Sequence, residues 1–412
     1  MSRSRARPGH GAAPTGWRER TPWLGIVLLA LLARLAFVAL APPRILWSDG
    51  IEYEQIGRSL VEHGTYGLQT LRPPGYPTLI AAVYAVFGPH LLALRLVEVV
   101  IGTITVWLIG VIGARLFGRP AGLISGVCAA LHPVLAFLPA TQYSENTLLL
   151  PIVLGFGALF AGWRQGGLWR WALAGLWFGV AILIRPNVVL MLPGLAVGLA
   201  LALRRERRAW LLPALVCGAA IALTLVPWTV RNHRVIGHWY FVATGGGRQF
   251  WIGNNPRADA DTRVSLWFDK DLDARLDRLP DPIAREHLLY QEGMAFMRAN
   301  PGRAAFLYMC ELRNQFALWP ETHTQVYVNS WSRIAQGLAS LFILAGVLLS
   351  LARLQTHQEL WPLLGAVLTY SLGCAFYYSI MRYRLVVEPC LLWMAGLGWA
   401  ATLRRWPQSV KR

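Results

Sequence analysis

Two polar stretches follow the first long apolar segment, and both contain side chains suited to acid–base chemistry. Asp49, Glu52 and Tyr53 lie in SDGIEYEQIG, and Arg72 opens RPPGYP farther along the same loop. A carboxylate within hydrogen-bond reach can take a proton from a hydroxyl group, so Asp49 and Glu52 are candidate catalytic residues. A structural alternative is a helix N-cap at Asp49, with Glu52 as its reciprocal partner three residues later.

The RPPGYP corner can hold a cation in place. Each proline fixes its own backbone and restricts the residue before it, so Arg72 has a rigid support. A planar guanidinium suits phosphate oxygens because it can donate two parallel N–H groups. Arg72 is therefore a candidate phosphate ligand. The alternative is a structural turn whose arginine extends to the membrane surface.

The composition places these residues in a membrane protein. Of the 412 residues, 55% are hydrophobic and 15% are charged, and the mean hydropathy is +0.42. These values are typical of polytopic membrane proteins. Many arginines flank apolar runs, so membrane topology explains the net charge of +18, and no nucleic acid is expected as a partner. The five cysteines show no paired spacing, and neither a disulfide framework nor a metal site is expected.

Apolar runs of sufficient length predict an all-α polytopic bundle of about ten transmembrane helices. The stretch from Tyr76 to Gly88 is apolar but too short to cross, so we expect a half-helix or an interfacial helix. Glu98, inside the second span, is expected to pair with Arg95. The predicted spans are 23–41, 94–116, 121–141, 146–162, 171–185, 187–203, 209–228, 333–352, 360–380 and 389–403.

Basic residues in alternate connections orient this bundle. The rule that cytoplasmic loops are rich in arginine and lysine places both termini in the cytoplasm. The first outer loop, 42–93, is then on the periplasmic side and is the expected catalytic loop. The basic residues on the inner side are Arg115, Arg119, Arg164, Arg170, the RRERR sequence at 204–208, Arg353, Arg404, Arg405, Lys411 and Arg412.

Three regions follow from this topology. Residues 1–228 form an N-terminal transmembrane region, 229–332 a periplasmic cap segment, and 333–412 the C-terminal transmembrane helices. The cap opens with the aromatic, β-like sequence HWYFVATGGGRQFWIGNNP and closes in a helix-period stretch that we expect on the membrane surface.

Three arginines on the predicted outer side are exceptions to the rule that basic residues concentrate in cytoplasmic loops. Arg185, Arg382 and Arg384 lie in tight outer turns, where membrane proteins disfavour arginine. A bound anion at the outer interface would explain their presence, because the guanidinium fork suits phosphate oxygens. Glu145, in TQYSENT, stands at the outer start of the fourth span, where the helix dipole favours an acid.

These pieces together resemble the GT-C glycosyltransferases, in particular the bacterial family-39 branch related to protein O-mannosyltransferases and to the lipid A aminoarabinose transferase. The resemblance implies a GT-C-like bundle with an outer amphipathic-helix loop and a periplasmic cap. It extends in order along nearly the whole chain, through SDGIEYEQIGRSL, RPPGYP, YSENTLL, AILIRPN, PWTVRNHRVIGHWYFVATGGGRQFWIGNNP and RYRLVVEP.

The resemblance also implies a reaction in a bacterial inner membrane. A sugar would pass from a polyprenyl-phosphate donor to a hydroxyl of a glycan, lipid or protein acceptor on the periplasmic face. Asp49 would be the catalytic base. Relatives have an acid just before the proline pair, where this chain has Leu71 and Arg72, so Glu145 is the expected substitute. Metal use varies among GT-C enzymes, which leaves a divalent cation open as a cofactor. The expected donor-phosphate ligands are Arg72, Arg185, Arg382 and Arg384, and the expected sugar- or acceptor-binding aromatics are Tyr53, Tyr76, Trp239, Tyr240 and Trp251.

Two other classes of protein are alternatives to the glycosyltransferase. A transporter or flippase of a lipid-linked sugar would also need arginines for phosphate, but it should show broken helices with polar groups near mid-membrane. A non-catalytic membrane scaffold would leave Asp49 as a helix cap. The ionisable residues gather at outer helix ends, and this favours the enzyme.

Overall fold

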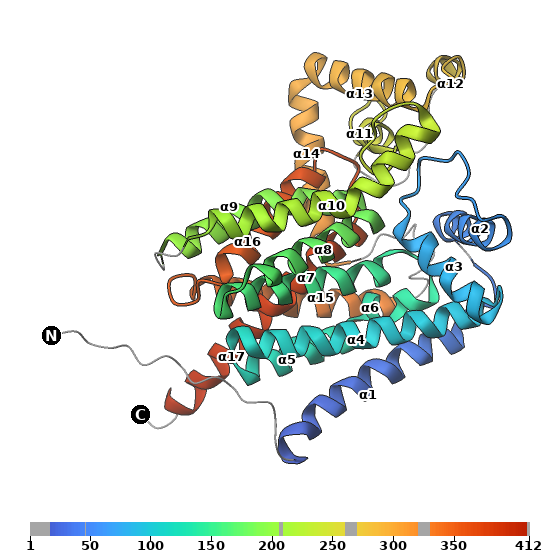
Figure 1. The fold of residues 1–412 in the computed structure, drawn as a ribbon. Helices are drawn as coiled ribbons and strands as arrows, with labels where there is room; N and C mark the ends of the chain where they lie inside the picture. Colours follow the sequence, from blue (N-terminus) through green and yellow to red (C-terminus); the bar gives the residue numbers. More distant parts are fainter. Residues whose placement is uncertain (1–16, 46, 206–208, 260–269, 320–329, 410–412) are drawn as a thin grey trace.

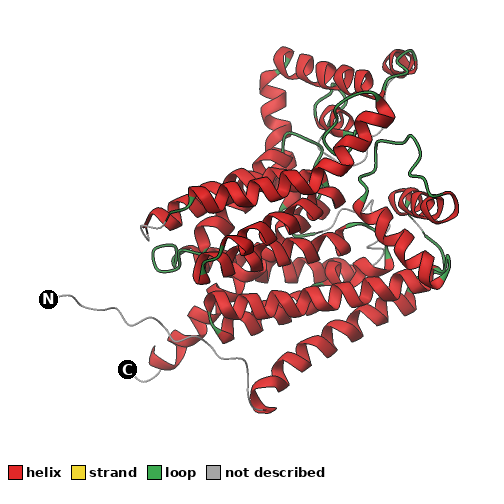
Figure 2. Cartoon of the chain, in the orientation of Figure 1, coloured by secondary structure: helices red, strands yellow, loops and turns green. Residues whose placement is uncertain are grey.

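The computed structural model describes residues 17–45, 47–205, 209–259, 270–319 and 330–409, which are mostly helical (Figures 1 and 2). No strand occurs among these residues, as the all-α prediction requires. The β-like interpretation of the cap sequence is wrong, because Gly246–Gly253 forms a helix, α11. Gly245, with a φ of 107°, turns the chain immediately before that helix. The basic residues at 206–208, 411 and 412 used for the orientation lie outside the described residues.

The N-terminal region contains the transmembrane helices and the first outer loop. Its helices are α1 (Trp17–Leu40), α2 (Ser48–His63), α3 (Gly75–Phe87), α4 (Leu91–Phe117), α5 (Arg119–Leu131), α6 (Pro133–Phe137), η1 (Leu138–Ala140), α7 (Glu145–Gln165), α8 (Leu168–Ile184), η2 (Pro186–Met191), α9 (Leu192–Arg205) and α10 (Leu211–Ile236). The cap contains α11, α12 (Lys270–Asp277), α13 (Pro282–Ala299) and α14 (Pro301–Gln315). The C-terminal helices are α15 (Ser330–Leu351), α16 (Leu360–Cys374), η3 (Met381–Val387) and α17 (Glu388–Ser409).

All ten predicted spans correspond to helical segments, but not all are long enough to cross a membrane. Seven described helices have the length and apolar composition of a span, and a bent pair, α5 with α6 and η1, makes an eighth. The predicted spans 171–185 and 360–380 form α8 and α16, which are apolar but only 17 and 15 residues long. The count of ten is therefore too high for full spans. The stretch 76–88 forms the 13-residue α3, as predicted for a short helix.

Pro186 explains where α8 ends. The residue before a proline is disfavoured in the α region, and Arg185 is extended with φ −144° and ψ 112°. The chain then continues as the short 3₁₀ helix η2. Arg185 therefore lies at a break in the helix, on a backbone that turns sharply.

The centre of the bundle is α17, whose side chains pack against α4, α5 and α7. Trp393 is fully buried, and its indole Nε1 donates a 2.8 Å hydrogen bond to the Ile109 carbonyl of α4. In contrast, α10 lies at the edge of the bundle and exposes apolar side chains such as Leu215 and Leu223. Such an apolar face is expected to contact the hydrocarbon core of a lipid bilayer.

The first outer loop and the cap lie at the same end of the bundle (Figure 1). Helix α2 packs on α3 at Gly57, where an added Cβ would lie 2.5 Å from Ile80 Cγ2. The cap has its own small core, and α14 joins it to α16 and η3. These contacts bring the loops before α3, α7, η2 and α17 together.

Candidate active site

The start of α2 presents Asp49 toward the bundle. The N-cap residue is Trp47, which makes no side-chain capping hydrogen bond, so the interpretation of Asp49 as a helix cap is wrong. Gly50 packs on the turn before α7, because a Cβ there would lie 3.3 Å from Gln142 Cβ. Gln142 is buried and adopts a positive φ of 57°, a strained conformation for a residue with a side chain.

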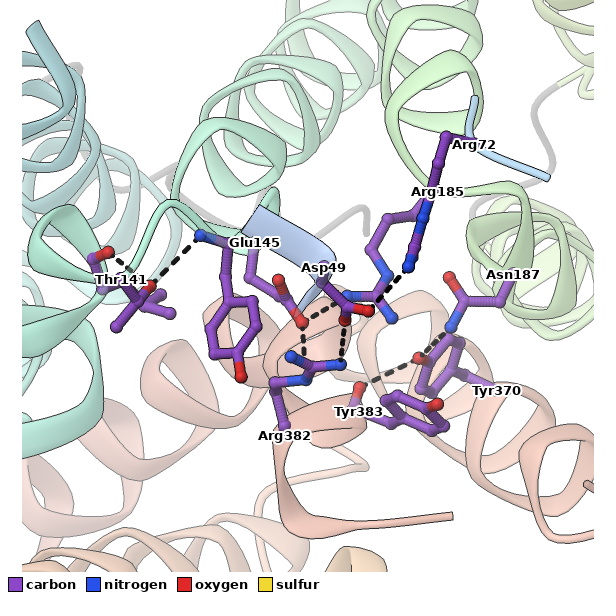
Figure 3. Close-up of polar contacts among 11 residues, drawn as sticks. Asp49, Arg72, Thr141, Glu145, Arg185, Asn187, Tyr370, Arg382 and Tyr383 are labelled. Carbon is purple, nitrogen blue, oxygen red and sulfur yellow. Dashed lines mark hydrogen bonds and ion pairs between the residues drawn. The ribbon is translucent and has the colours of Figure 1, made fainter. Parts of the chain in front are cut away.

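Asp49 accepts hydrogen bonds from two arginines that belong to different ends of the sequence (Figure 3). Its Oδ1 lies 2.7 Å from Arg72 Nη2, and its Oδ2 lies 3.1 Å from Arg382 Nη2. Arg72 Nε also donates to Glu52 Oε2 at 2.7 Å. The sequence predicts catalytic carboxylates and phosphate-binding arginines in separate segments, and in the structure these side chains are in direct contact.

The loop that carries Arg72 is held by aromatic contacts. The Tyr66 hydroxyl donates to the carbonyl oxygens of Arg72 and Pro73, at 2.8 and 3.0 Å. The ring of Tyr66 lies beneath the guanidinium of Arg231, which also covers Trp228 of α10. This anchorage adds to the rigidity of the proline corner and fixes the Arg72 backbone against the bundle.

Glu145 begins α7 and receives two further arginines. Its Oε1 accepts from Arg185 Nη1 and, at 3.0 Å, from Arg382 Nε. The carboxylate is almost fully buried, so its charge requires these partners. Arg382 thereby bridges Asp49 and Glu145, and its guanidinium lies 4.1 Å from the centre of the Tyr143 ring. We call Asp49, Glu145, Arg72, Arg185 and Arg382 the charge cluster.

Helix α7 is fixed beside this cluster by an internal carboxylate. Glu98 of α4 accepts from Asn146 Nδ2 and, at 2.7 Å, from Thr147 Oγ1. The predicted pairing of Glu98 with Arg95 is wrong, because Arg95 instead donates to carbonyls of the loop after α1, at Pro42 and Arg44. The two residues after Glu145 are thus tied to a neighbouring helix.

Comparison with known proteins finds similarity over part of the chain. Residues 71–230 match the family described as dolichyl-phosphate-mannose-protein mannosyltransferase. A curated relative from Pseudomonas aeruginosa, named undecaprenyl phosphate-alpha-4-amino-4-deoxy-L-arabinose arabinosyl transferase, is 30% identical over 214 residues. That match covers 48% of this chain and 38% of the relative, so the chain matches well under half of the relative's length.

Solved structures show the same fold over most of the chain. The oligosaccharyltransferase of Archaeoglobus fulgidus superposes with a TM-score of 0.56 at 14% identity, over 92% of this chain and 49% of that protein. The chain therefore shares the fold of that protein. A second structure of an Archaeoglobus fulgidus oligosaccharyltransferase, in complex with an inhibitory peptide and a dolichol-phosphate, has a TM-score of 0.53 at 14% identity and covers 96% of this chain and 52% of that one.

One of the predicted phosphate ligands lies apart from the charge cluster. Arg384 is buried, and its Nε donates to Glu388 Oε2 at 2.9 Å while its Nη2 contacts Ser340 Oγ of α15 at 3.2 Å. Glu388 also contacts His132 Nε2 at 3.3 Å. Arg384 therefore belongs to an internal ionic group that joins α6, α15 and α17.

The predicted sugar-binding aromatics are divided among three places. Tyr53 and Tyr76 meet edge to face at 5.2 Å beneath Arg72, and both are buried. Trp239 stacks on His233 at the end of α10, and the Tyr240 hydroxyl donates to the Ala243 carbonyl. The structure thus places Tyr53 and Tyr76 beside the charge cluster, as support for it. Trp251 is packed in the core of the cap, against Leu272, Leu276 and Leu289.

A metal ion does not fit the described carboxylates as they stand. Among these residues, no group of three or more His, Cys, Asp or Glu side chains could hold one. Both oxygens of Asp49 are paired with guanidiniums, whereas Glu145 takes both of its guanidiniums on Oε1 and its buried Oε2 has no hydrogen-bond partner.

The electrostatics of the charge cluster favour an ionised Asp49. Burial alone would raise the pKa of Asp49, but the guanidiniums of Arg382 and Arg72 outweigh burial and lower it from 3.8 to about 2. Asp49 is then a very weak base for as long as both arginines hold it. Any anion that draws these arginines away would restore its basicity.

Proposed function

We propose that this protein is a membrane glycosyltransferase of the GT-C type. It moves a sugar from a polyprenyl-phosphate donor to an acceptor hydroxyl on the periplasmic face of the bacterial inner membrane. The observation that carries the proposal is the shared contact of Asp49 with Arg72 and Arg382. A candidate base and candidate phosphate ligands meet there, and this supports the proposal.

The reaction needs both groups. The acceptor oxygen attacks the anomeric carbon of the sugar while Asp49 takes its proton, and the bond from that carbon to the phosphate oxygen breaks. The polyprenyl phosphate leaves with the electron pair of that bond. Arg72, Arg185 and Arg382 stabilise the growing negative charge on the leaving phosphate.

Donor binding also prepares the base. The phosphate competes with Asp49 and Glu145 for the guanidiniums, because phosphate oxygens suit the same fork. When Arg72 and Arg382 turn toward the phosphate, they no longer lower the pKa of Asp49, whereas burial still raises it. The base becomes effective only when a donor is present, and we therefore expect the donor to bind before the acceptor.

The relatives support this choice of donor. The Pseudomonas aeruginosa relative is named for undecaprenyl phosphate, and one archaeal structure of the same fold holds a dolichol-phosphate. Both are polyprenyl phosphates. The sugar and the acceptor of this chain are chosen by parts of the site that these names do not describe.

A transfer assay tests the proposal. Purified protein in detergent is given synthetic undecaprenyl-phosphate sugars with acceptor fractions from the cell envelope, and mass spectrometry follows both products. The expected result is release of undecaprenyl phosphate together with a glycosylated acceptor. A flippase would move the intact lipid-linked sugar without cleaving it, so donor that stays whole under all acceptor conditions would refute the enzyme.

The pH dependence should differ between the free enzyme and its donor complex. Asp49 must be ionised to act, so the rate falls when the pH drops below its pKa. In the free enzyme that pKa is about 2, and in the donor complex it is higher. The acid limb of kcat should therefore lie at a higher pH than the acid limb of kcat/KM for the donor. Initial rates from roughly pH 4 to 8 measure both, and coincident acid limbs would contradict the donor-induced release of Asp49.

The proposed orientation predicts accessible positions on each side. In a cysteine-free background, Asp259→Cys in the cap should react with an impermeant thiol reagent in intact spheroplasts, because the cap is periplasmic. Arg204→Cys, at the end of α9, should react only after lysis. The reverse labelling pattern would place the charge cluster on the cytoplasmic side and would remove the periplasmic reaction.

A further inference from the structure

One buried hydroxyl group links the two turns that carry Arg185 and Arg382. Tyr370 of α16 is fully buried, and its hydroxyl accepts a 2.9 Å hydrogen bond from Asn187 Nδ2. The same hydroxyl donates a 2.9 Å hydrogen bond to the backbone carbonyl of Tyr383. Figure 3 shows this chain of contacts beside the charge cluster.

The two partners of Tyr370 are close in sequence to the arginines. Asn187 follows Arg185 by two residues at the start of η2, and Tyr383 follows Arg382 directly in η3. Both guanidiniums bind the same oxygen of Glu145. Glu145 therefore fixes the distance between the two guanidinium groups, and Tyr370 fixes the distance between the two turns that carry them.

Tyr370 is itself held on a rigid support. Thr369 Oγ1, the neighbouring side chain, accepts a 3.1 Å hydrogen bond from the Gly194 backbone N–H of α9. At the same crossing, a Cβ on Gly194 would lie 1.9 Å from the Gly365 carbonyl oxygen, so the backbones of α9 and α16 touch. Small residues permit such close approach in membrane bundles. A hydroxyl mounted on this crossing has little freedom to move.

We propose that Tyr370 is a positioning residue, which sets the distance between the two guanidiniums that receive the donor phosphate. This proposal rests on the proposed function. Tyr370 does not touch the donor; it acts through the backbone at Tyr383 and the side chain of Asn187. When the phosphate displaces Glu145, this outer link still holds the arginines at the spacing that two phosphate oxygens need. An error of about 1 Å in such a placement can cost about 100-fold in rate.

The test is Tyr370→Phe, which keeps the buried ring and removes only the hydroxyl. We expect the KM for an undecaprenyl-phosphate sugar and the inhibition constant of undecaprenyl phosphate to rise about tenfold or more. The KM for the acceptor and the melting temperature should stay near the wild-type values. Tyr84→Phe is the matched control, because the buried Tyr84 of α3 also loses one hydroxyl hydrogen bond, to Glu54 of α2 at 3.2 Å. It should change the donor constants less than twofold.

A second variant separates positioning from general loosening of the fold. Asn187→Ala removes one end of the link, so it should weaken donor binding in the same direction. The double variant should be no worse than Tyr370→Phe alone, because that variant already breaks both contacts. Donor constants within twofold of wild type in Tyr370→Phe, or equal losses for donor and acceptor, would overturn the proposal.

Hydrogen exchange tests the link without any substrate. In Tyr370→Phe, the backbone amides of 381–387 should exchange faster than in wild type, while those of α1 should not. If wild-type protein transfers no sugar but this difference is seen, the glycosyltransferase proposal fails and the link between the two turns stands. Unchanged exchange at 381–387 would sink the positioning role even in an active enzyme.

Discussion

Asp49→Asn should lower the rate of sugar transfer by about 10²–10⁴-fold, the usual cost of losing a general base. The amide cannot take the acceptor proton, although it has nearly the same shape as the carboxylate. It also presents an N–H group to one of the two arginines that now donate to Asp49, at 2.7 and 3.1 Å. Donor affinity should change far less than turnover, since Arg72, Arg185 and Arg382 remain. The measurement is kcat and donor KM for the purified variant.

Asp281→Asn is the matched control for this substitution. Asp281 is a true N-cap, and its carboxylate accepts from the backbone N–H groups of Ile283 and Ala284 at the start of α13. Asparagine caps helices as well as aspartate does, so this variant should express and turn over normally. If Asp49→Asn were equally active, Asp49 would not be the base, and Glu52 would be the next residue to test.

Arg382→Ala should cost roughly 2–4 kcal/mol of transition-state stabilisation and lower kcat and kcat/KM together. Arg382 is the residue that contacts both Asp49 and Glu145, so its loss removes a phosphate ligand and leaves the buried Glu145 with fewer partners. Arg382→Lys should keep part of the activity, because the charge remains but the fork that serves two carboxylates is lost. Full turnover in Arg382→Ala would exclude it as a phosphate ligand.

Variants of two further arginines serve as controls for Arg382→Ala. Arg58→Ala, on the exposed face of α2, breaks exposed pairs with Glu54 and Glu62 and should be almost silent. Arg384→Ala should instead reduce the amount of folded protein, because it leaves Glu388 buried without its guanidinium, at a cost of about 3–5 kcal/mol. Yield and melting temperature measure the destabilisation expected of Arg384→Ala. Turnover per folded molecule measures the activity expected to remain in Arg58→Ala.

The contrast between Arg382 and Arg384 shows what the sequence could predict. The charge rule marks both as unusual in a predicted outer turn, but it cannot say where each side chain points. The turn is a 3₁₀ helix, with about 120° per residue, so side chains two positions apart point in widely different directions. One arginine enters the charge cluster and the other enters the bundle.

Other parts of the site followed from sequence more directly. The helix at Asp49, the corner at Arg72 and the helix start at Glu145 were visible as local patterns of charge and proline. Tyr370 was not, because it is an ordinary tyrosine in an apolar helix until α9 and α16 are packed together. The strand-like cap sequence misled for a similar reason: a short aromatic run can bury its side chains from a helix as well as from a strand.

The contact of Asp49 with Arg382 joins residues 333 positions apart in the chain. Ribosomes add about 5–20 residues per second, so Asp49 reaches the membrane roughly 15–70 s before the arginine that completes its neutralisation. During that time the nascent chain has α2 and the start of α7 in place, but the carboxylates of Asp49 and Glu145 lack Arg382. The closing of the charge cluster is therefore a late event in the biosynthesis of the protein, and on the proposed function no sugar is transferred before η3 has been synthesised.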